Sequence, residues 1–204
     1  MKIQSGKLII EHGDVVEPIV IQLNYLASSQ DEHVVDDFIA WWTAPSHLKF
    51  IPWMVWNKGT PPCSHTEVGF VINGELWSFS STSRKELGTT GRTGTRWVEG
   101  KKLLRNPDRW LLQTKAIHRI EAGCMIRRAN SLIGQQYDFI GVGADFILPI
   151  DIMRVKKTIY CSKAVCFVLT NKHRRVSPRH QWKWADNHGF ADGYIGLPLM
   201  KGGK

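Results

Sequence analysis

The chain has 204 residues, 43% of them apolar, and a net charge of +9. A chain of this length and composition can fold around one hydrophobic core, so we expect a single domain over 1–204 with its core roughly at 60–180. No run approaches roughly 18 uncharged apolar residues, and charges interrupt the N-terminal apolar run. We therefore expect neither a membrane-spanning segment nor a signal peptide.

The positive charge predicts attraction to polyanions such as nucleic acid, anionic lipid or acidic cell-wall polymers. A basic surface with no dedicated partner explains the charge equally well. The net positive charge is the sole reason to consider nucleic acid as a partner, because no nucleic-acid-binding motif is present.

The four cysteines form no Cys-x-x-Cys pair, which argues against a zinc site and against a disulfide framework. They are Cys63, Cys124, Cys161 and Cys166. Reduced thiols are typical of proteins made in a reducing cytoplasm, which is the expected location.

The first 59 residues are expected to pack on the core as strands followed by a helix. Residues 3–26 alternate loosely and contain many β-branched residues, which predicts two strands that turn at Gly13-Asp14. The segment 31–43 has helical apolar spacing with acidic residues at its start.

A β-hairpin is predicted over residues 64–82, because two apolar runs meet at Asn73-Gly74, a pair typical of the type I′ turn. Counting from the turn places Val68 opposite Phe79 and Glu67 opposite Ser80. One face of the hairpin is then apolar. The other face collects His65, Glu67, Gly69, Ser78, Ser80 and Thr82. This polar face is either a solvated outer surface, the commoner case, or a functional site.

A loop rich in Gly, Thr and Arg follows over residues 84–96. Its arginines, Arg84, Arg92 and Arg96, could bind an anionic substrate, and a simple solvated loop is an equal alternative. The loop leaves the hairpin directly after the polar face, so we expect it to border the same site.

The remaining elements are a strand near residue 116, a helix over 121–134 that ends at Gly134, and a helix that begins near Cys161. The tail over 181–204 is expected to be irregular.

Cys161 and His65 are the candidate nucleophile and base. A helix N-terminus stabilises a thiolate, and a histidine on the polar strand face can take its proton. Glu67 or Ser80 would orient the imidazole as the third member, with Glu67 favoured because a carboxylate stabilises an imidazolium more strongly. The alternative for Cys161 is a buried structural cysteine.

Three segments in this order resemble the circularly permuted NlpC-like branch of the papain-fold cysteine hydrolases, closest to its bacteriophage-encoded members. They are "CSHTEVGFVINGELWSFSS", "GQQYDFIGVG" and "IYCSKAVCFVL". The resemblance covers roughly residues 60–180. It implies an α+β fold with an antiparallel sheet packed against helices and the nucleophile at a helix N-terminus.

The same resemblance implies that Cys161 is the nucleophile, that His65 is the base and that Tyr137 helps to bind the oxyanion. Two features depart from the family pattern. Lys163 follows Cys-Ser where an acidic residue is frequent, and the second hairpin strand offers only serines as a third catalytic residue.

The expected function is therefore a thiol peptidase or amidase that acts on peptidoglycan peptides or a protein through an acyl-enzyme, without metal or organic cofactor. The alternative is an inactive virion protein of the same fold, associated with other virion proteins in the tail or neck of a bacteriophage.

Overall fold

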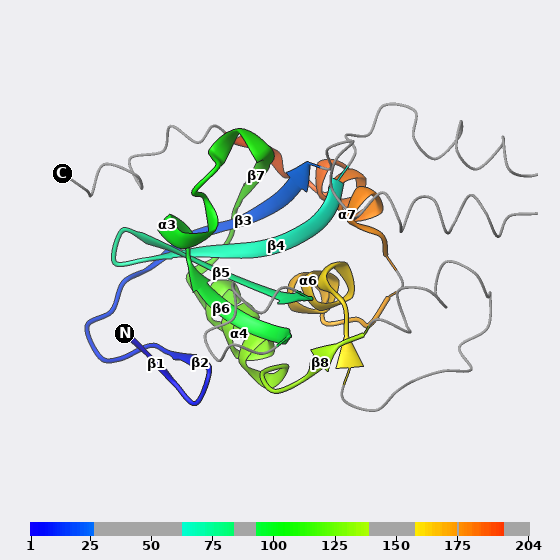
Figure 1. The fold of residues 1–204 in the computed structure, drawn as a ribbon. Coiled ribbons are helices and arrows are strands. Elements are labelled where there is room, and N and C mark those ends of the chain that lie inside the picture. Colours follow the sequence, from blue (N-terminus) through cyan, green and yellow to red (C-terminus); the bar gives the residue numbers. More distant parts are fainter. Residues whose placement is uncertain (27–62, 84–92, 139–157, 175, 194–204) are drawn as a thin grey trace, which may run out of the picture.

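The computed structural model describes residues 1–26, 63–83, 93–138, 158–174 and 176–193 (Figure 1). The strands are β1 Lys2–Gln4, β2 Lys7–Ile9, β3 Val16–Leu26, β4 Cys63–Ile72, β5 Glu75–Thr82, β6 Gly94–Glu99, β7 Trp110–Ala116, β8 Gln136–Tyr137, β9 Thr158–Ile159 and β10 Ala191–Gly193. The helices are α3 Gly100–Leu103, the 3₁₀ helix η2 Pro107–Arg109, α4 Arg119–Ser131, α6 Cys161–Thr170 and α7 Pro178–Asp186.

The centre of the fold is a six-stranded antiparallel sheet in the order β10-β7-β3-β4-β5-β6. The predicted hairpin is confirmed as β4 and β5, with Val68 opposite Phe79. Asn73 and Gly74 have φ of 53° and 76°, the two positive values that a type I′ turn requires. The chain is thus of the mixed α+β class that the sequence predicts.

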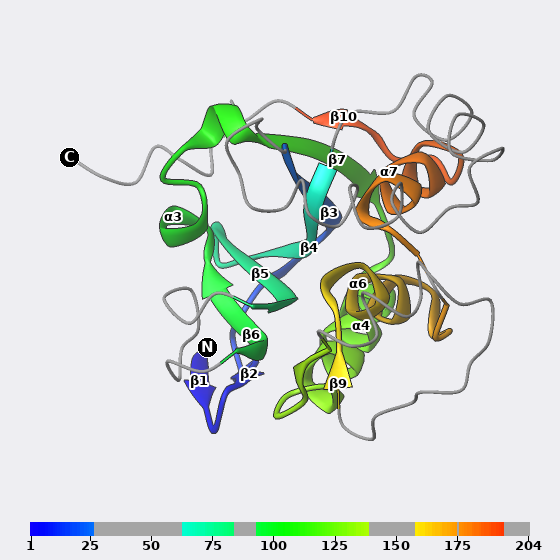
Figure 2. The same cartoon turned by 45° about the vertical axis from the view of Figure 1, so that its right-hand side comes forward.

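Helices cover both faces of this sheet. Figure 2 shows α4, α6 and α7 on one side of the strands and α3 on the other, and these helices pack directly on β3 to β6. The larger core, on the side of α4 and α6, includes Val68, Phe70, Phe79, Trp97, Met125 and Val165. The smaller core, on the side of α3, consists of Ile21, Leu23, Val71, Leu76, Val98, Leu103, Leu104, Trp110 and Leu112.

The smaller core corrects the expectation that the polar hairpin face could be a solvated surface. Glu67, Ser78 and Ser80 on that face are all 0% exposed. Gly69 shares the face, and a Cβ there would lie 2.9 Å from Leu76 Cδ1, so this glycine allows close packing. The alternation of the hairpin separates two cores instead of separating core from solvent.

The N-terminal region differs from the prediction of two strands. β1 and β2 pair with each other across Ser5-Gly6, and β3 instead joins the central sheet. Asn130 of α4 holds β2, because its side chain donates to the Leu8 carbonyl and accepts from the Leu8 N–H. The core therefore extends well before residue 60. The helix expected over 31–43 lies outside the described residues.

The expectation of an irregular tail after residue 181 is wrong for the part that the structure describes. Helix α7 begins after Ser177, whose hydroxyl accepts from the N–H of His180, and Pro178 occupies its first position. Gln181 is fully buried and donates through Nε2 to Gln22 Oε1 at 3.2 Å, which fixes α7 on the sheet. β10 then pairs with β7 at the edge of the sheet.

A side-chain and a backbone hydrogen bond connect the sheet to the short parallel pair β8–β9 that precedes α6. Ser81 donates to the carbonyl of Ile159 at 2.6 Å, and the N–H of Thr95 donates to the carbonyl of Gln135 at 3.0 Å. Tyr137 lies opposite Ile159 in this pair. The start of α6 is thereby fixed relative to the ends of β5 and β6.

None of the helices in the described segments is long and apolar enough to cross a membrane.

We expect Gly94→Ala to destabilise the fold more than Gly134→Ala. Both glycines have positive φ, of 122° and 93°, so both alanines incur a backbone penalty of about 1–2 kcal/mol. A Cβ at Gly94 would also lie 2.3 Å from the carbonyl oxygen of Gln135, whereas at Gly134 nothing lies within 4 Å. The added clash should cost a further ~1–3 kcal/mol.

Urea unfolding of the two variants measures the difference. Equal losses of unfolding free energy would show that the contact between β6 and the segment before β8 does not constrain the fold.

Candidate active site

His65 lies near the start of β4, in a row of aromatic side chains on neighbouring strands. It pairs with Tyr25 of β3, and Tyr25 pairs with Trp110 of β7. The Trp110 ring stands edge-on to His65 with centroids 6.3 Å apart. The imidazole is 19% exposed, so it is largely enclosed but keeps a path to solvent.

Cys161 is the first residue of α6, as the sequence predicts, and it is 4% exposed. The N–H groups of the first helical turn have no acceptor within the helix, and they point toward its N-terminal end. Cys161 therefore combines a thiol with adjacent backbone donors and the positive end of the helix dipole.

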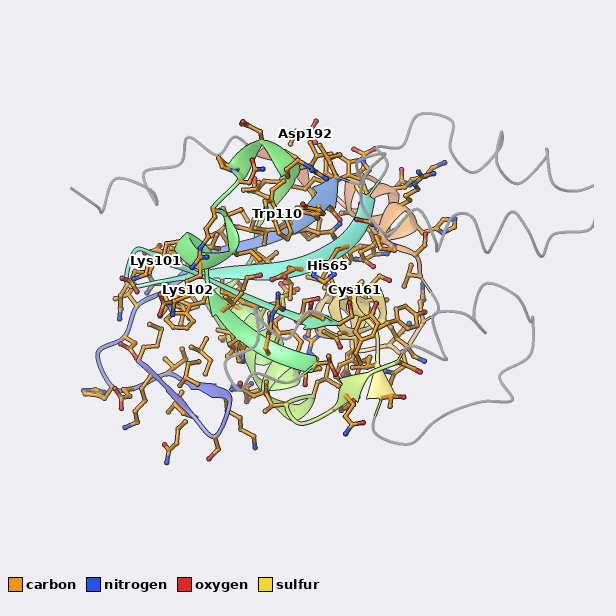
Figure 3. The ribbon with its side chains drawn as sticks, in the orientation of Figure 1. His65, Lys101, Lys102, Trp110, Cys161 and Asp192 are labelled. Atoms are coloured by element: carbon orange, nitrogen blue, oxygen red, sulfur yellow. The ribbon has the colours of Figure 1, made fainter. Side chains whose placement is uncertain are left out.

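The structure brings the side chains of Cys161 and His65 close together, near enough for Cys161 to raise the pKa of the imidazole (Figure 3). Figure 3 shows His65 beside Cys161, with Trp110 on the other side of the imidazole. The ladder between β4 and β5 ends at Val68–Phe79, and α6 packs against both strands near this end. Cys161 thus reaches the sheet where the two strands stop pairing.

Glu67 binds the other side of the imidazole. Its Oε1 lies 3.0 Å from His65 Nε2, a direct contact between residues two positions apart on one strand. Because Nε2 contacts the carboxylate, Nδ1 is the nitrogen that remains for Cys161. Thiol, imidazole and carboxylate therefore form a continuous chain, the arrangement of a catalytic triad.

The Glu67 carboxylate is 0% exposed and is surrounded by donors. Arg96 Nη2 lies 2.6 Å from Oε1, and the hydroxyl of Ser78 donates to Oε2 at 2.6 Å. Burial alone would raise the pKa of Glu67, but Arg96, followed by His65 and Ser78, lowers it to about 2. The carboxylate is thus ionised across the physiological range.

The pKa of His65 is shifted in the opposite direction. Burial alone would lower this pKa, but the interactions with Cys161 and then with Glu67 outweigh burial and raise it to about 9. The arrangement therefore favours an imidazolium form of His65 at neutral pH.

Arg96 does not have the predicted role of binding substrate from a loop. It lies on β6 opposite Ser80, is 2% exposed and pairs with Glu67. Its Nε and Nη1 have no hydrogen-bond partner within the described segments. The glycine-rich sequence before Arg96 favours a loop. In the structure, however, Thr95 to Glu99 belong to a strand that pairs with β5, so Arg96 lies within the sheet.

Ser80 also differs from its predicted role. Its hydroxyl donates to the carbonyl of Thr66 at 2.7 Å, and Ser78 is the serine that binds Glu67. The β4–β5 ladder ends at Val68–Phe79, one residue before the expected pair of Glu67 with Ser80, and the Ser80 hydroxyl bonds to the backbone instead. Strand alternation places both serines on the correct face and does not distinguish between them.

Of the three remaining predicted site residues, the structure describes only Tyr137. Tyr137 lines a cleft together with His65, while Arg84 and Arg92 lie outside the described residues. Thr82 and Ser83, which immediately precede that segment, line the same cleft.

The other cysteines are free thiols in different surroundings. Burial raises the pKa of Cys63 to about 12 and also raises that of Cys166. Within the described segments, no three potential metal ligands gather at one place.

No family model matches this sequence, and no curated protein or solved structure is found to be similar to it.

We expect Glu67→Gln to flatten the acid limb of the stability curve. The Glu67 pKa is about 2 in the folded chain, against an ordinary value near 4.5. Its ionised form therefore stabilises the native chain above pH 4.5, and that contribution, up to ~3 kcal/mol, is lost as the pH falls toward 2. Urea unfolding at pH 2 to 6 measures the slope.

The exposed hairpin residue Glu75, changed to Gln, serves as the matched control and should keep the wild-type slope. An unchanged slope in Glu67→Gln would mean that this carboxylate is not ionised through its contacts with Arg96 and His65.

Arg96→Met should destabilise the protein by about 3–5 kcal/mol, because it leaves the buried Glu67 charge without its main partner. The double variant with Glu67→Gln should be much less unstable than the sum of the two single variants, since no uncompensated charge remains. A double-mutant cycle by urea unfolding measures this coupling. Additive losses would argue against a buried ion pair.

Proposed function

We propose that the protein is a cysteine hydrolase that cleaves an amide bond through an acyl-enzyme. The observation that carries the proposal is the position of Cys161, at the N-terminus of α6, beside His65, whose Nε2 is held by the buried Glu67 (Figure 3). This order of groups activates a thiol, orients a base and stabilises the charged base.

In the first half of the reaction, the Cys161 thiolate attacks the carbonyl carbon of the substrate. The carbonyl oxygen gains the negative charge and lies at the start of α6, where the N–H of Cys161 can donate to it. The hydroxyl of Tyr137 is the second candidate donor. Nδ1–H of His65 then protonates the leaving amine, the C–N bond breaks and a thioester remains on Cys161.

In the second half, neutral His65 removes a proton from water, and the resulting hydroxide attacks the thioester carbonyl. The C–S bond breaks, the acid product leaves and the imidazolium–thiolate pair is restored. Glu67 stays ionised throughout and stabilises each imidazolium form of His65.

The chain order of the site supports membership in the permuted NlpC-like branch of the papain fold as part of this proposal. The histidine strand comes first, the Tyr137 segment second and the cysteine helix last, in agreement with the resemblance of the sequence. A peptide of bacterial peptidoglycan is the substrate that this resemblance favours. Glu67 supplies the third residue from the histidine's own strand.

A second candidate is an inactive virion protein with the same fold. The observation that favours it is the 4% exposure of Cys161, which leaves little of the thiol accessible in the described part of the chain. In that case the charged cluster would only stabilise the fold.

Alkylation with iodoacetamide at pH 6 separates the two candidates. We expect Cys161 to react at least about tenfold faster than Cys63, because a thiolate paired with His65 persists where an ordinary thiol is protonated. Mass spectrometry of digested peptides reads both cysteines in one sample, so Cys63, whose pKa burial raises to about 12, is an internal control.

His65→Ala and Glu67→Gln should reduce the advantage of Cys161, while Ser80→Ala should keep it. Release of amines from peptidoglycan fragments should be lost in Cys161→Ala. If Cys161 reacts no faster than Cys63 in the native chain, the hydrolase proposal is wrong and the inactive alternative is favoured.

A further inference from the structure

A cleft of about 210 Å³ opens beside His65. Its walls come from β3, β4, the end of β5, the end of α3 with the residues that follow, the start of β7, and Tyr137 of β8. Clefts for drug-sized ligands measure about 300–1,000 Å³. This smaller volume suits a group of roughly the size of one amino-acid residue.

The position of the cleft relative to Cys161 and His65 indicates which part of the substrate the cleft would hold. His65 lines the cleft and Cys161 does not. In the proposed reaction, His65 gives its proton to the leaving amine, whereas the acyl group stays on Cys161. A group held in this cleft is therefore on the leaving side of the scissile bond.

The charged side chains that line the cleft are all basic. Arg105 and Lys102 lie on its wall beside His65, and no Asp or Glu is among the lining residues that the structure describes. Lys102 is partly neutralised by Glu99 at 3.2 Å, whereas Arg105 forms no salt bridge within the described segments. The cleft thus offers a planar guanidinium that can bind a carboxylate through two hydrogen bonds.

The rest of the wall is apolar with single polar groups. Tyr25 and Trp110 meet edge-to-face with centroids 5.1 Å apart, and they supply a flat surface for a carbon skeleton. Ser64 Oγ is buried and has no hydrogen-bond partner in the part of the chain that is described, so it can bind a polar group of the ligand. Figure 3 shows Trp110 on one side of His65 and Lys102 at the α3 side of the site.

We propose that this cleft binds a leaving group that carries a carboxylate, with Arg105 as the main contact and Tyr25 and Trp110 against its carbon chain. The assignment to the leaving side rests on the proposed hydrolase function. The substrate class is then an amide whose amine belongs to an acidic amino acid or to a C-terminal residue. These two sources share the carboxylate and differ in its position.

Binding of four single-residue probes to the full chain carrying Cys161→Ala tests the proposal without turnover. The probes are glutamate, glutamine, glutamate α-amide and glutamine α-amide, all with a free amine, and NMR titration measures their affinity. We expect the probes with a carboxylate to bind at least about tenfold more tightly than glutamine α-amide. Tighter binding of glutamine than of glutamate α-amide assigns a C-terminal carboxylate, and the reverse assigns an acidic side chain.

Arg105→Gln should remove most of the tenfold preference, whereas Lys101→Gln should keep it. Lys101 is the matched control because it is a basic residue four positions before Arg105, is 74% exposed and does not line the cleft. Equal binding of all four probes, no binding of any probe, or a preference that survives Arg105→Gln would overturn the proposal. Because the titration needs no reaction, a failure of Cys161 labelling would refute the hydrolase function separately.

Discussion

The rest of the site depends on one buried charge, the carboxylate of Glu67. An ionised group without solvent is costly unless opposite charges and hydrogen-bond donors surround it. Arg96, Ser78 and His65 meet this requirement from three sides. The carboxylate in turn holds Nε2 of His65 and leaves Nδ1 for Cys161, so the orientation of the imidazole depends on the partners of the acid.

The buried carboxylate of Glu67 has two positive partners. The imidazolium of His65 and the guanidinium of Arg96 both contact its Oε1. Opposite charges in contact limit the cost of burying the carboxylate, and Arg96 keeps Glu67 paired whatever the charge of His65.

The sequence was sufficient to predict the hairpin, its register and a helix that begins at Cys161, because each depends on a local signal. Asn73-Gly74 specifies the turn, period-two alternation specifies the faces, and the apolar pattern after Cys161 specifies a helix. The contact of Glu67 with His65 also follows from their spacing on one strand.

The roles of Arg96 and Ser78 could not be predicted in the same way. A strand with alternating polar residues is typical of a sheet with one face in water, whereas here α3 and a second core cover that face. Under this cover, a polar residue is a buried partner and not a surface group. The glycine-rich residues before Arg96 also favoured a loop instead of a strand. Its partner Glu67 lies on β4, two strands away across β5, and only the tertiary structure shows that the two residues meet.

The order of the site along the chain has a consequence for biosynthesis. His65, Glu67 and Arg96 all precede Cys161, and the contact between His65 and Cys161 spans 96 positions. Contacts of such long range form only after much chain entropy has been lost, so they arise late in folding. In a ribosome-bound or partly folded chain, Cys161 therefore lies apart from His65, and the two residues meet only when the native sheet and α6 have assembled.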